Sequence, residues 1–272
     1  MKIAIIGLGL IGGSLAKAVK VNTDDTVYGF DIDSSVTQRA IAEGAVDFAA
    51  DTESFAQCDL FVIALYPGAA AEFFLDNVRH FKSGAVAVDC AGVKAKICEQ
   101  LESAAKQHGV HFIGGHPMAG IECSGYENSF AELFKNANMI LCPYEGEDRL
   151  EFVKEYFLRL GFSGISVTSP QEHDKVIAYT SQLAHIVSSA YAKSKFAKKH
   201  TGFSAGSYRD LTRVAKLNED MWAELFMENR SNLLGEIDNL IARLKEYHSA
   251  LSGYDSDRLK LLLLEGKKII SN

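Results

Sequence analysis

Residues 2–12 read KIAIIGLGLIG, and this stretch decides the fold of the 272-residue chain. An apolar run is followed by the pattern G-x-G-x-x-G, and a helical pattern continues from Ile11 to Val19. In such a pattern the first glycine permits a tight turn, the second lets the backbone approach a pyrophosphate, and the third lets the helix pack on the sheet. The phosphates meet free N–H groups at the positive end of the helix. The stretch therefore predicts a dinucleotide-binding strand–turn–helix unit, with cofactor-binding residues Gly7, Gly9, Leu10, Ile11 and Gly12.

A second apolar run, Val27–Phe30, ends at Asp31, 19 residues after Gly12. A carboxylate near this spacing hydrogen-bonds the adenosine ribose and repels a 2′-phosphate. Asp33 or Ser34 can cap the next helix, so Asp31 is not needed for that purpose. We therefore expect NAD rather than NADP as the cofactor, and Pro67 completes the cofactor-binding residues that we expect. Taken without Asp31, the glycine pattern could equally be a turn that binds no ligand.

Apolar runs and amphipathic runs alternate over residues 1–168, which is typical of βα units. The apolar runs do not alternate with polar residues, so we expect a parallel sheet that helices cover on both faces. The predicted strands are Ile3–Ile6, Val27–Phe30, Leu60–Ala64, Ala85–Val88, His111–Ile113 and Met139–Leu141. The predicted helices between them are Ile11–Val19, Ser35–Glu43, Ala69–Phe81 and Ala95–His108. The fold class is α/β, with an N-terminal Rossmann domain.

Residues 169–272 are expected to form a second, all-helical domain. Ser169-Pro170-Gln171-Glu172 has the form of a capping box, and it predicts a helix as far as Lys199 with His173 and Asp174 on its surface. Another helix is expected over 218–251 and a last one over 256–270. Apolar residues at alternating intervals of four and three form a heptad seam at Leu233, Ile237, Leu240, Leu244, Tyr247 and Leu251. That seam could pack within one chain or between two copies.

Composition excludes several classes of protein. The net charge is −7, whereas a nucleic-acid-binding protein needs a basic face. The longest apolar runs fall short of a membrane span, and glycines interrupt the N-terminal run where a signal peptide would continue. The five cysteines are widely spaced without a CxxC, so we expect neither disulfides nor a metal site, and a cytoplasmic location. Residues 1–168 carry 13 basic and 22 acidic side chains and the remainder 15 and 13, so the helical half is better suited to an anion.

His116 is the first candidate for chemistry. It lies in Gly114–Gly120, directly after a predicted strand, and the carboxyl ends of strands face the ligand crevice of an open α/β sheet. A neutral imidazole there can take a proton from a substrate hydroxyl while hydride leaves the same carbon. A histidine that only bonds loop backbone explains the local spacing equally well.

Two further candidates lie in the helical half. His185 shares a polar, uncharged helix face with Ser181, Ser188 and Ser189, which is more typical of a pocket lining than of a solvated face. A half-buried structural histidine fits the composition equally well. Arg209 and Arg213 are four residues apart, so one helix face could offer two guanidinium groups to a carboxylate. A surface charge cluster is the alternative for these two arginines.

With these residues in place, the whole chain resembles the prephenate dehydrogenase family. The resemblance rests on motifs in the family's order and spacing, of which GGHPMAG and RDLTRVA are the specific ones. The motifs are GLGLIGGSLA (7–16), Asp31, DCAGVK (89–94), GGHPMAG (114–120), SQLAH (181–185), YRDLTRVA (208–215) and Met221-Trp222.

The resemblance implies an oxidative decarboxylation of prephenate to 4-hydroxyphenylpyruvate with NAD, on the route to tyrosine, in a dimer formed by the helical domain. It implies that His116 is the catalytic histidine that bonds the ring hydroxyl, that Arg213 holds a substrate carboxylate, and that His185 lines the substrate pocket. It also implies that Glu122 and Asp210 join an ionic network of the pocket.

Three positions depart from the family pattern. Gly92 stands where many members have a serine that contacts the substrate hydroxyl, Ile121 stands where some have threonine, and Gln182 stands where some have a second histidine. Gly92 and Gln182 remain among the expected substrate-binding residues.

Other functions stay open at this stage. Some members of the family prefer arogenate, and His185 and Gln182 do not decide between the two substrates. A 3-hydroxyacid dehydrogenase would need a catalytic lysine, for which Lys175 and Lys216 are available. A non-catalytic, NAD-responsive binding protein is a third possibility, since a fold alone does not fix a function.

Overall fold

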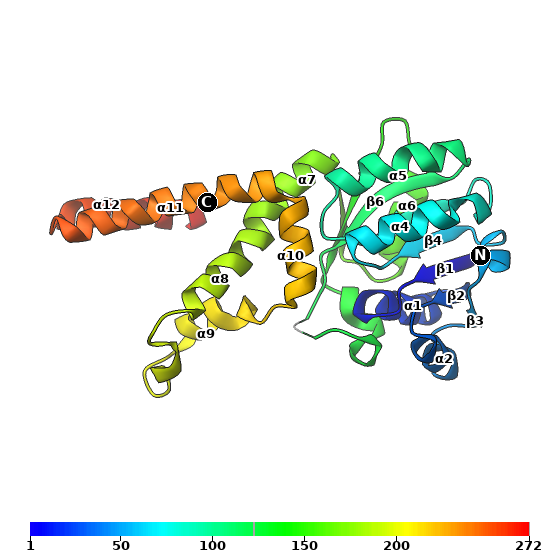
Figure 1. Ribbon diagram of the computed structural model, residues 1–272, viewed down its shortest axis with the longest axis horizontal. Coiled ribbons are helices and arrows are strands. Elements are labelled where there is room, and N and C mark those ends of the chain that lie inside the picture. The colour runs from blue at the N-terminus through cyan, green and yellow to red at the C-terminus, as the bar shows by residue number, and fades with distance from the viewer. Residues whose placement is uncertain (122, 272) are drawn as a thin grey trace.

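The computed structural model describes residues 1–121 and 123–271. Its described strands form one sheet in the order β3-β2-β1-β4-β5-β6-β7-β8 (Figure 1). Neighbouring strands run parallel except β6 and β7. The strands are β1 Lys2–Ile6, β2 Thr26–Phe30, β3 Phe48–Ala49, β4 Leu60–Ile63, β5 Val86–Asp89, β6 His111–Pro117, β7 Asn138–Pro143 and β8 Gly164–Val167.

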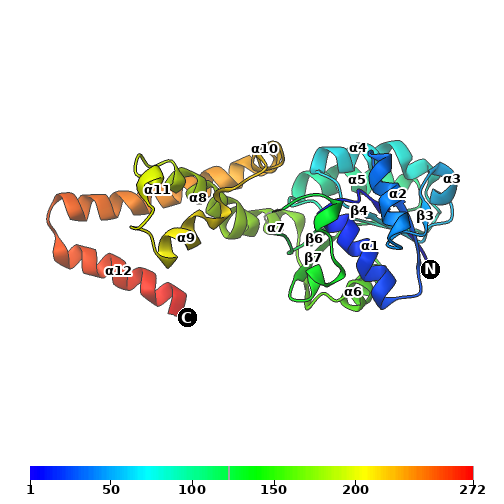
Figure 2. The ribbon, with the colours of Figure 1, turned by 90° about the horizontal axis from the view of Figure 1, so that it is seen from below.

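Helices cover both faces of this sheet. One core cluster includes residues of α1 and α6, and the other includes residues of α3, α4 and α5, so α1 and α6 lie on one side and α4 and α5 on the other (Figure 2). The helices are α1 Leu10–Asn22, α2 Ser34–Ala42, α3 Thr52–Phe55, α4 Pro67–Asn77, α5 Ala95–Gln107 and α6 Leu150–Arg159.

The strand β1 shows why its sequence lacks alternation. Ile3 and Ile5 point into one core cluster and Ala4 and Ile6 into the other, and all four are fully buried. A strand with both faces covered needs apolar residues at every position. The predicted Rossmann class is therefore confirmed.

The sheet differs from the prediction in three respects. The short edge strands β3 and β8 were not predicted. β7 is antiparallel to β6, because the described residues that connect them, 118–121 and 123–137, form only short 3-10 turns, Tyr126–Asn128 and Ala131–Phe134, and no crossover helix. β6 continues past Ile113 to Pro117, so His116 lies in a strand, paired with Ile140, and not in a loop.

The second half is helical, and its described elements form an extension from the sheet domain (Figure 1). α7 and α10 lie at the junction with the sheet domain, and α11 and α12 extend away from it (Figures 1 and 2). The helices are α7 Pro170–Ile177, α8 Ala184–Ala192, α9 Gly206–Thr212, α10 Glu219–Glu228, α11 Arg230–Ser252 and α12 Ser256–Ser271. None of the helices in the described part of the chain is long and apolar enough to cross a membrane.

Two predicted helices were wrong in extent. The helix expected from Ser169 to Lys199 does begin with Ser169 as its N-cap, but it passes through a π-helical stretch, Ala178–Leu183, and ends at Ala192. A π-helical stretch adds a residue to the turn and often occurs at functional sites. The helix expected over 218–251 is divided at Asn229, where α10 ends and α11 begins.

Candidate active site

The turn between β1 and α1 has the form of a pyrophosphate cradle. Gly7 has a φ of +84°, which other residues rarely adopt. An added Cβ at Gly12 would lie 1.8 Å from the carbonyl oxygen of Gly7, whereas at Gly9 it would have no described atom within 4 Å. The open side at Gly9 therefore leaves room for a phosphate against the backbone.

The start of α1 is suited to a negative charge. Leu10 and Ile11 form its first turn, which contains no acidic residue, and within residues 1–121 no side chain caps its N-terminus. Its free N–H groups therefore face the open side of the glycine turn. The residues present fit the phosphates of a dinucleotide.

Asp31 lies at the end of β2, next to this turn. Its carboxylate accepts hydrogen bonds from the backbone N–H of Leu8 over 2.8 Å and of Asp33 over 3.0 Å. Asp33 itself caps α2 by accepting from Ser35, as the sequence predicts. Pro67 is the first residue of α4, at the carboxyl edge of the sheet beyond β4.

His116 lies near the carboxyl end of β6 and is half-buried. Its Nε2 lies beside Gly92, since an added Cβ at Gly92 would be 3.9 Å from that nitrogen. The same Cβ would be 3.3 Å from Cδ2 of Leu225, which α10 brings from the helical half. The structure therefore brings together His116 and Gly92, as predicted, and adds Leu225.

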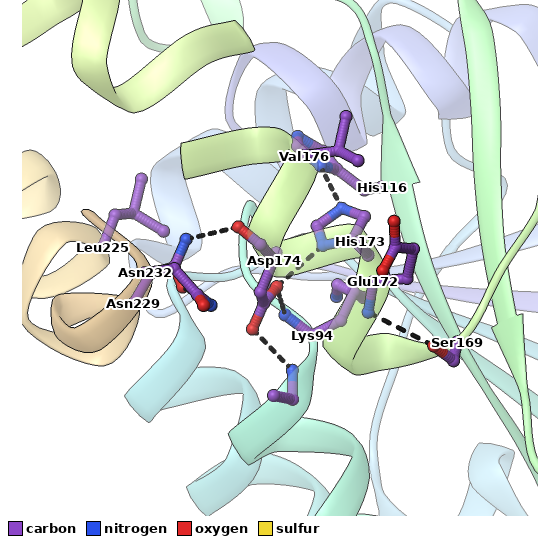
Figure 3. A network of polar contacts seen from close by, with 12 residues as sticks. Lys94, His116, Ser169, Glu172, His173, Asp174, Val176, Leu225, Asn229 and Asn232 are labelled. Carbon is purple, nitrogen blue, oxygen red and sulfur yellow. Dashed lines mark hydrogen bonds and ion pairs between the residues drawn. The ribbon is translucent and has the colours of Figure 1, made fainter. Parts of the chain in front are cut away.

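The other ring nitrogen of His116 begins a chain of polar contacts (Figure 3). His116 Nδ1 lies 2.8 Å from His173 Nε2, and His173 Nδ1 lies 2.7 Å from Asp174 Oδ1. The carboxylate of Asp174 also accepts from the backbone N–H of Lys94 (2.8 Å) and of Ala95 (2.9 Å) at the start of α5. The expectation that His173 and Asp174 lie on the surface was wrong: both are 2% exposed. They are buried because α7 packs against α5.

The surroundings of His116 keep its imidazole neutral. Burial lowers the pKa of His116 well below its ordinary value, and His173 and Lys94 lower it further. Desolvation and a nearby positive charge both disfavour the protonated form of an imidazole. His116 is therefore in its basic form at neutral pH.

A buried ion pair supports the strand ends beneath His116. Lys94 Nζ bonds Asp89 Oδ2, and both side chains are fully buried. Asp89 also accepts from the backbone N–H of Ala91 over 2.9 Å and of Gly115 over 3.1 Å. This carboxylate therefore joins the end of β5 to the neighbouring β6.

Gln182 belongs to a buried network and not to an open surface. It is 1% exposed, its Nε2 donates to the carbonyl of Leu225 over 3.2 Å, and its Oε1 accepts from Asn229 over 2.8 Å. Asn229 also donates to the backbone carbonyl of Asp174 over 2.7 Å. Both polar atoms of the Gln182 amide therefore bond protein groups. These bonds hold α10 against α7.

The polar face of α8 holds the segment that carries Arg213. His185 Nδ1 bonds the carbonyl of Val214 over 3.0 Å, and Ser188 Oγ donates to the carbonyl of Leu211 over 2.7 Å. The His185 ring also packs on Trp222 of α10, with 3.9 Å between ring centroids. This face contacts backbone and thereby positions the residues on either side of Arg213.

Arg213 is the C-cap of α9: its backbone is helical and its N–H bonds the carbonyl of Arg209, so the two arginines lie one helical turn apart, as the sequence predicts. Arg209 and Asp210 are exposed on α9. Glu122, which we expect in the same pocket, lies outside the described residues.

α10 contacts the sheet domain through two carboxylates. Glu224 accepts from the backbone N–H of Gly68 over 2.7 Å, and Glu228 bonds Lys96 Nζ over 2.6 Å. Leu225 lies between them in the sequence and reaches Gly92. One helix therefore joins the His185 region to the His116 region.

A group of side chains suited to a metal ion lies elsewhere. Among the described residues, His111, Glu147 and Asp148 offer ligand atoms within 4.8 Å of one another. They lie at the start of β6, at the end opposite His116, and His111 Nδ1 is 2.9 Å from Glu147 Oε1. This group is therefore separate from the site around His116.

Together, these features place a neutral base and a glycine turn suited to a dinucleotide at the same edge of the sheet. The turn after β1 and His116 on β6 both lie at carboxyl ends of strands, the edge at which open α/β sheets bind ligands. Such a site can remove a hydroxyl proton while a hydride leaves the adjacent carbon.

Known protein families match the two halves of the chain separately. A sequence model of the prephenate dehydrogenase nucleotide-binding domain matches residues 15–165, and one of the prephenate dehydrogenase dimerization domain matches residues 169–265. The cyclohexadienyl dehydrogenase of Zymomonas mobilis is 32% identical over 98% of this chain and 94% of that protein.

Solved structures show the same architecture over the full length. The arogenate dehydrogenase of Synechocystis has a TM-score of 0.85 and 27% identity, covering 100% of this chain and 99% of that one. The prephenate dehydrogenase of A. aeolicus, in complex with hydroxyphenyl propionate and NAD+, has a TM-score of 0.86 and 26% identity, covering 100% and 97%.

Proposed function

The chain belongs to the prephenate dehydrogenase family and is an NAD-dependent dehydrogenase, and from that premise we propose that it converts prephenate to 4-hydroxyphenylpyruvate. The reaction oxidises the ring carbinol, releases carbon dioxide and serves tyrosine formation. The relatives include a cyclohexadienyl, an arogenate and a prephenate dehydrogenase. Prephenate and arogenate differ in the side chain and not in the ring that is oxidised.

The observation that carries this proposal is the position of His116. Its neutral imidazole presents Nε2 to the space beside Gly92, at the edge of the sheet where the dinucleotide turn lies. In our proposal this nitrogen takes the proton of the 4-hydroxyl group as the carbon–oxygen bond gains carbonyl character. The ring becomes aromatic when carbon dioxide leaves, which makes the overall reaction favourable.

The glycine turn would hold NAD, which would supply the hydride acceptor. We assign Gly7, Gly9, Gly12 and the first turn of α1 to its phosphates and Asp31 to its ribose. The backbone amides need no rearrangement for this, because α1 already presents them to the open side of Gly9.

We assign the substrate carboxylates to the helical half. Arg213 is proposed to hold one of them through its planar guanidinium, and His185, fixed by Val214 and Trp222, to line the pocket beside it. Gly92 has no hydroxyl group, so we propose that only its backbone contacts the substrate. Asp210 and Glu122 remain proposed members of the surrounding ionic network.

We also propose that the protein is a homodimer that forms through its helical domain, in the cytoplasm. The family model that matches residues 169–265 describes a dimerization domain, and large apolar side chains of α11 and α12 are exposed in the single chain. The five cysteines are free, which suits a reducing compartment.

The test measures NADH or NADPH formation by absorbance, with prephenate or arogenate as substrate and NAD or NADP as cofactor. We expect the highest kcat/KM for prephenate with NAD. A preference for arogenate would replace the proposed substrate and keep the reaction class. A folded protein inactive in all four mixtures would contradict the proposed function.

The role of His116 is tested by His116→Ala. We expect kcat to fall by ~10²–10⁴-fold, the usual contribution of a positioned acid–base group. His111→Ala is the matched control, since His111 lies on the same strand at the opposite end. Activity of the His116 variant near that of the wild type would remove His116 from the mechanism.

A further inference from the structure

We propose that His173 and Asp174 are positioning residues that fix the tautomer of His116, so that Nε2 is always the bare, proton-accepting nitrogen. The proposal rests on the proposed function, because it assigns His116 as the base. His173 and Asp174 lie on α7, whereas His116 lies on β6, so the base is set only where the helical half packs on the sheet domain (Figure 3).

The direction of each hydrogen bond follows from Asp174. A carboxylate only accepts hydrogen bonds, and the backbone N–H groups of Lys94 and Ala95 hold this one in place. His173 Nδ1, 2.7 Å away, must therefore carry a proton and donate it to the bond. In this proposal His173 is a neutral imidazole, so its Nε2 carries no proton.

The same argument passes to the next ring. His173 Nε2 is an acceptor, so His116 Nδ1, at 2.8 Å, must be the donor. His116 Nε2 then keeps its lone pair, and that is the nitrogen beside Gly92. The buried carboxylate thus selects, through two rings, which nitrogen of His116 meets the substrate.

The hydrogen bonds from His116 through His173 to Asp174 also stabilise the positive charge that His116 acquires. When Nε2 takes the hydroxyl proton, the imidazolium still donates from Nδ1 to His173, and no second proton has to move. Asp174 provides a negative charge at the far end of the chain, while the nearby Lys94 is already paired with Asp89. His173 and Asp174 have side chains 0% and 3% exposed, so water does not compete for these bonds.

Variants of His173 test the proposal by kinetics. His173→Leu removes the acceptor for His116 Nδ1, and we expect kcat to fall by at least ~10²-fold, since an imidazole held in the wrong tautomer costs up to ~10⁴-fold in serine proteases. We expect the KM values for prephenate and NAD to stay within about threefold of the wild type, because the arginine and the glycine turn are untouched.

A conservative variant separates positioning from packing. In His173→Gln the amide NH₂ faces the acceptor Asp174, so the amide oxygen faces His116 and accepts its Nδ1–H. We expect this variant to recover at least tenfold in kcat over His173→Leu. Asp174→Ala, which frees His173 to adopt either tautomer, should lose kcat as His173→Leu does. Glu172→Gln is the matched control, because Glu172 is an exposed carboxylate of the same helix, and we expect wild-type kinetics.

A measurement without substrate keeps this test independent of the proposed function. In ¹⁵N-labelled wild-type protein, we expect the His116 ring to show a protonated Nδ1 and a bare Nε2, with the signal assigned by its loss in His116→Ala. We expect a mixture of tautomers in His173→Leu. A protonated Nε2 in the wild type, or wild-type kcat in folded His173→Leu, would overturn the proposal. So would a His173→Gln variant no more active than His173→Leu.

Discussion

As the proposed base, His116 should give the activity a pH dependence whose direction follows from the environment of its imidazole. Burial, His173 and Lys94 all lower the pKa of its imidazole below the ordinary value, and Lys94 is itself paired with Asp89. The basic form is the active one, so activity is lost only when the pH falls through the lowered pKa.

We therefore expect kcat/KM to stay at its neutral plateau as the pH falls through 6.5, the ordinary pKa of histidine, and to decline only under more acidic conditions. Initial rates between pH 5 and pH 9 check this, with protein stability followed over the same range by circular dichroism. A profile already reduced by half at pH 6.5 would mean that the essential base has an unshifted pKa.

We propose that Asp31 sets the preference for NAD over NADP. Replacing it with asparagine removes the charge that repels a 2′-phosphate and weakens the bond to the ribose. We expect Asp31→Asn to lower kcat/KM for NAD by roughly 10–100-fold, the value of a charge-assisted hydrogen bond, and to narrow the ratio of NAD to NADP.

Kinetics with both cofactors measure this ratio. Asp33→Asn is the control, since Asp33 makes the same kind of backbone bond as the N-cap of α2. An unchanged ratio in Asp31→Asn would show that another group selects the cofactor.

At the scale of elements, the loop from β5 to α5 depends on a buried charge pair. Lys94 and Asp89 are fully buried, and Asp89 also bonds the backbone of Ala91 and Gly115. Removal of one partner leaves an uncompensated buried charge. We expect Lys94→Met to lower the free energy of unfolding by ~3–5 kcal/mol.

Urea denaturation measures this loss. Lys106→Met, which removes an exposed i,i+4 partner of Glu102 on α5, should cost less than about 0.5 kcal/mol. We expect Asp89→Asn to restore part of the stability in the double variant. A loss below 1 kcal/mol in Lys94→Met would contradict the importance of the pair.

The predicted elements show what a sequence pattern can and cannot reveal. β1, β2, β4 and β5 were placed within one residue at every end, because strands buried on both faces leave continuous apolar runs. β3 and β8 were missed, since edge strands are short and carry no such run. The π-helical stretch and the break at Asn229 preserve helical periodicity on either side, so the sequence alone did not show them.

The candidate site divides in the same way. The glycine turn and the end of β2 are local in sequence, so Gly7, Gly12 and Asp31 could be predicted from spacing alone. His173 and Asp174 could not, because only the packing of α7 on α5 buries them 57 residues from His116. Their signal in the sequence was a histidine–aspartate pair near the start of a predicted helix.

At the scale of the whole molecule, α10 and α7 connect the two halves. α7 supplies the partners of His116, while α10 contacts Gly68 and Lys96 and brings Leu225 to Gly92. The proposed base and the proposed carboxylate-binding segment therefore depend on the same contacts between halves. A change in the contacts of α10 with Gly68 and Lys96 should alter kcat and KM together.

The far end of the helical half exposes large apolar side chains. α11 and α12 form an antiparallel pair, joined by the bond from the Tyr247 hydroxyl to the carbonyl of Leu262. The predicted heptad seam divides along α11: Leu233 is buried within the chain, whereas Leu244 and Leu251 are 58% and 62% exposed. We propose that a second copy of the chain covers these two leucines.

Leu244→Asp combined with Leu251→Asp should therefore dissociate the dimer. Burial of each leucine contributes about 1.5–3 kcal/mol, and a two-fold interface contains each residue twice, so the double substitution acts at four positions. Size-exclusion chromatography with light scattering should give the mass of two chains for the wild type and of one for the variant. Leu75→Asp, at a leucine of similar exposure on α4, should stay dimeric. A dimeric double variant would place the interface elsewhere. A monomeric wild type would mean that the exposed leucines do not associate.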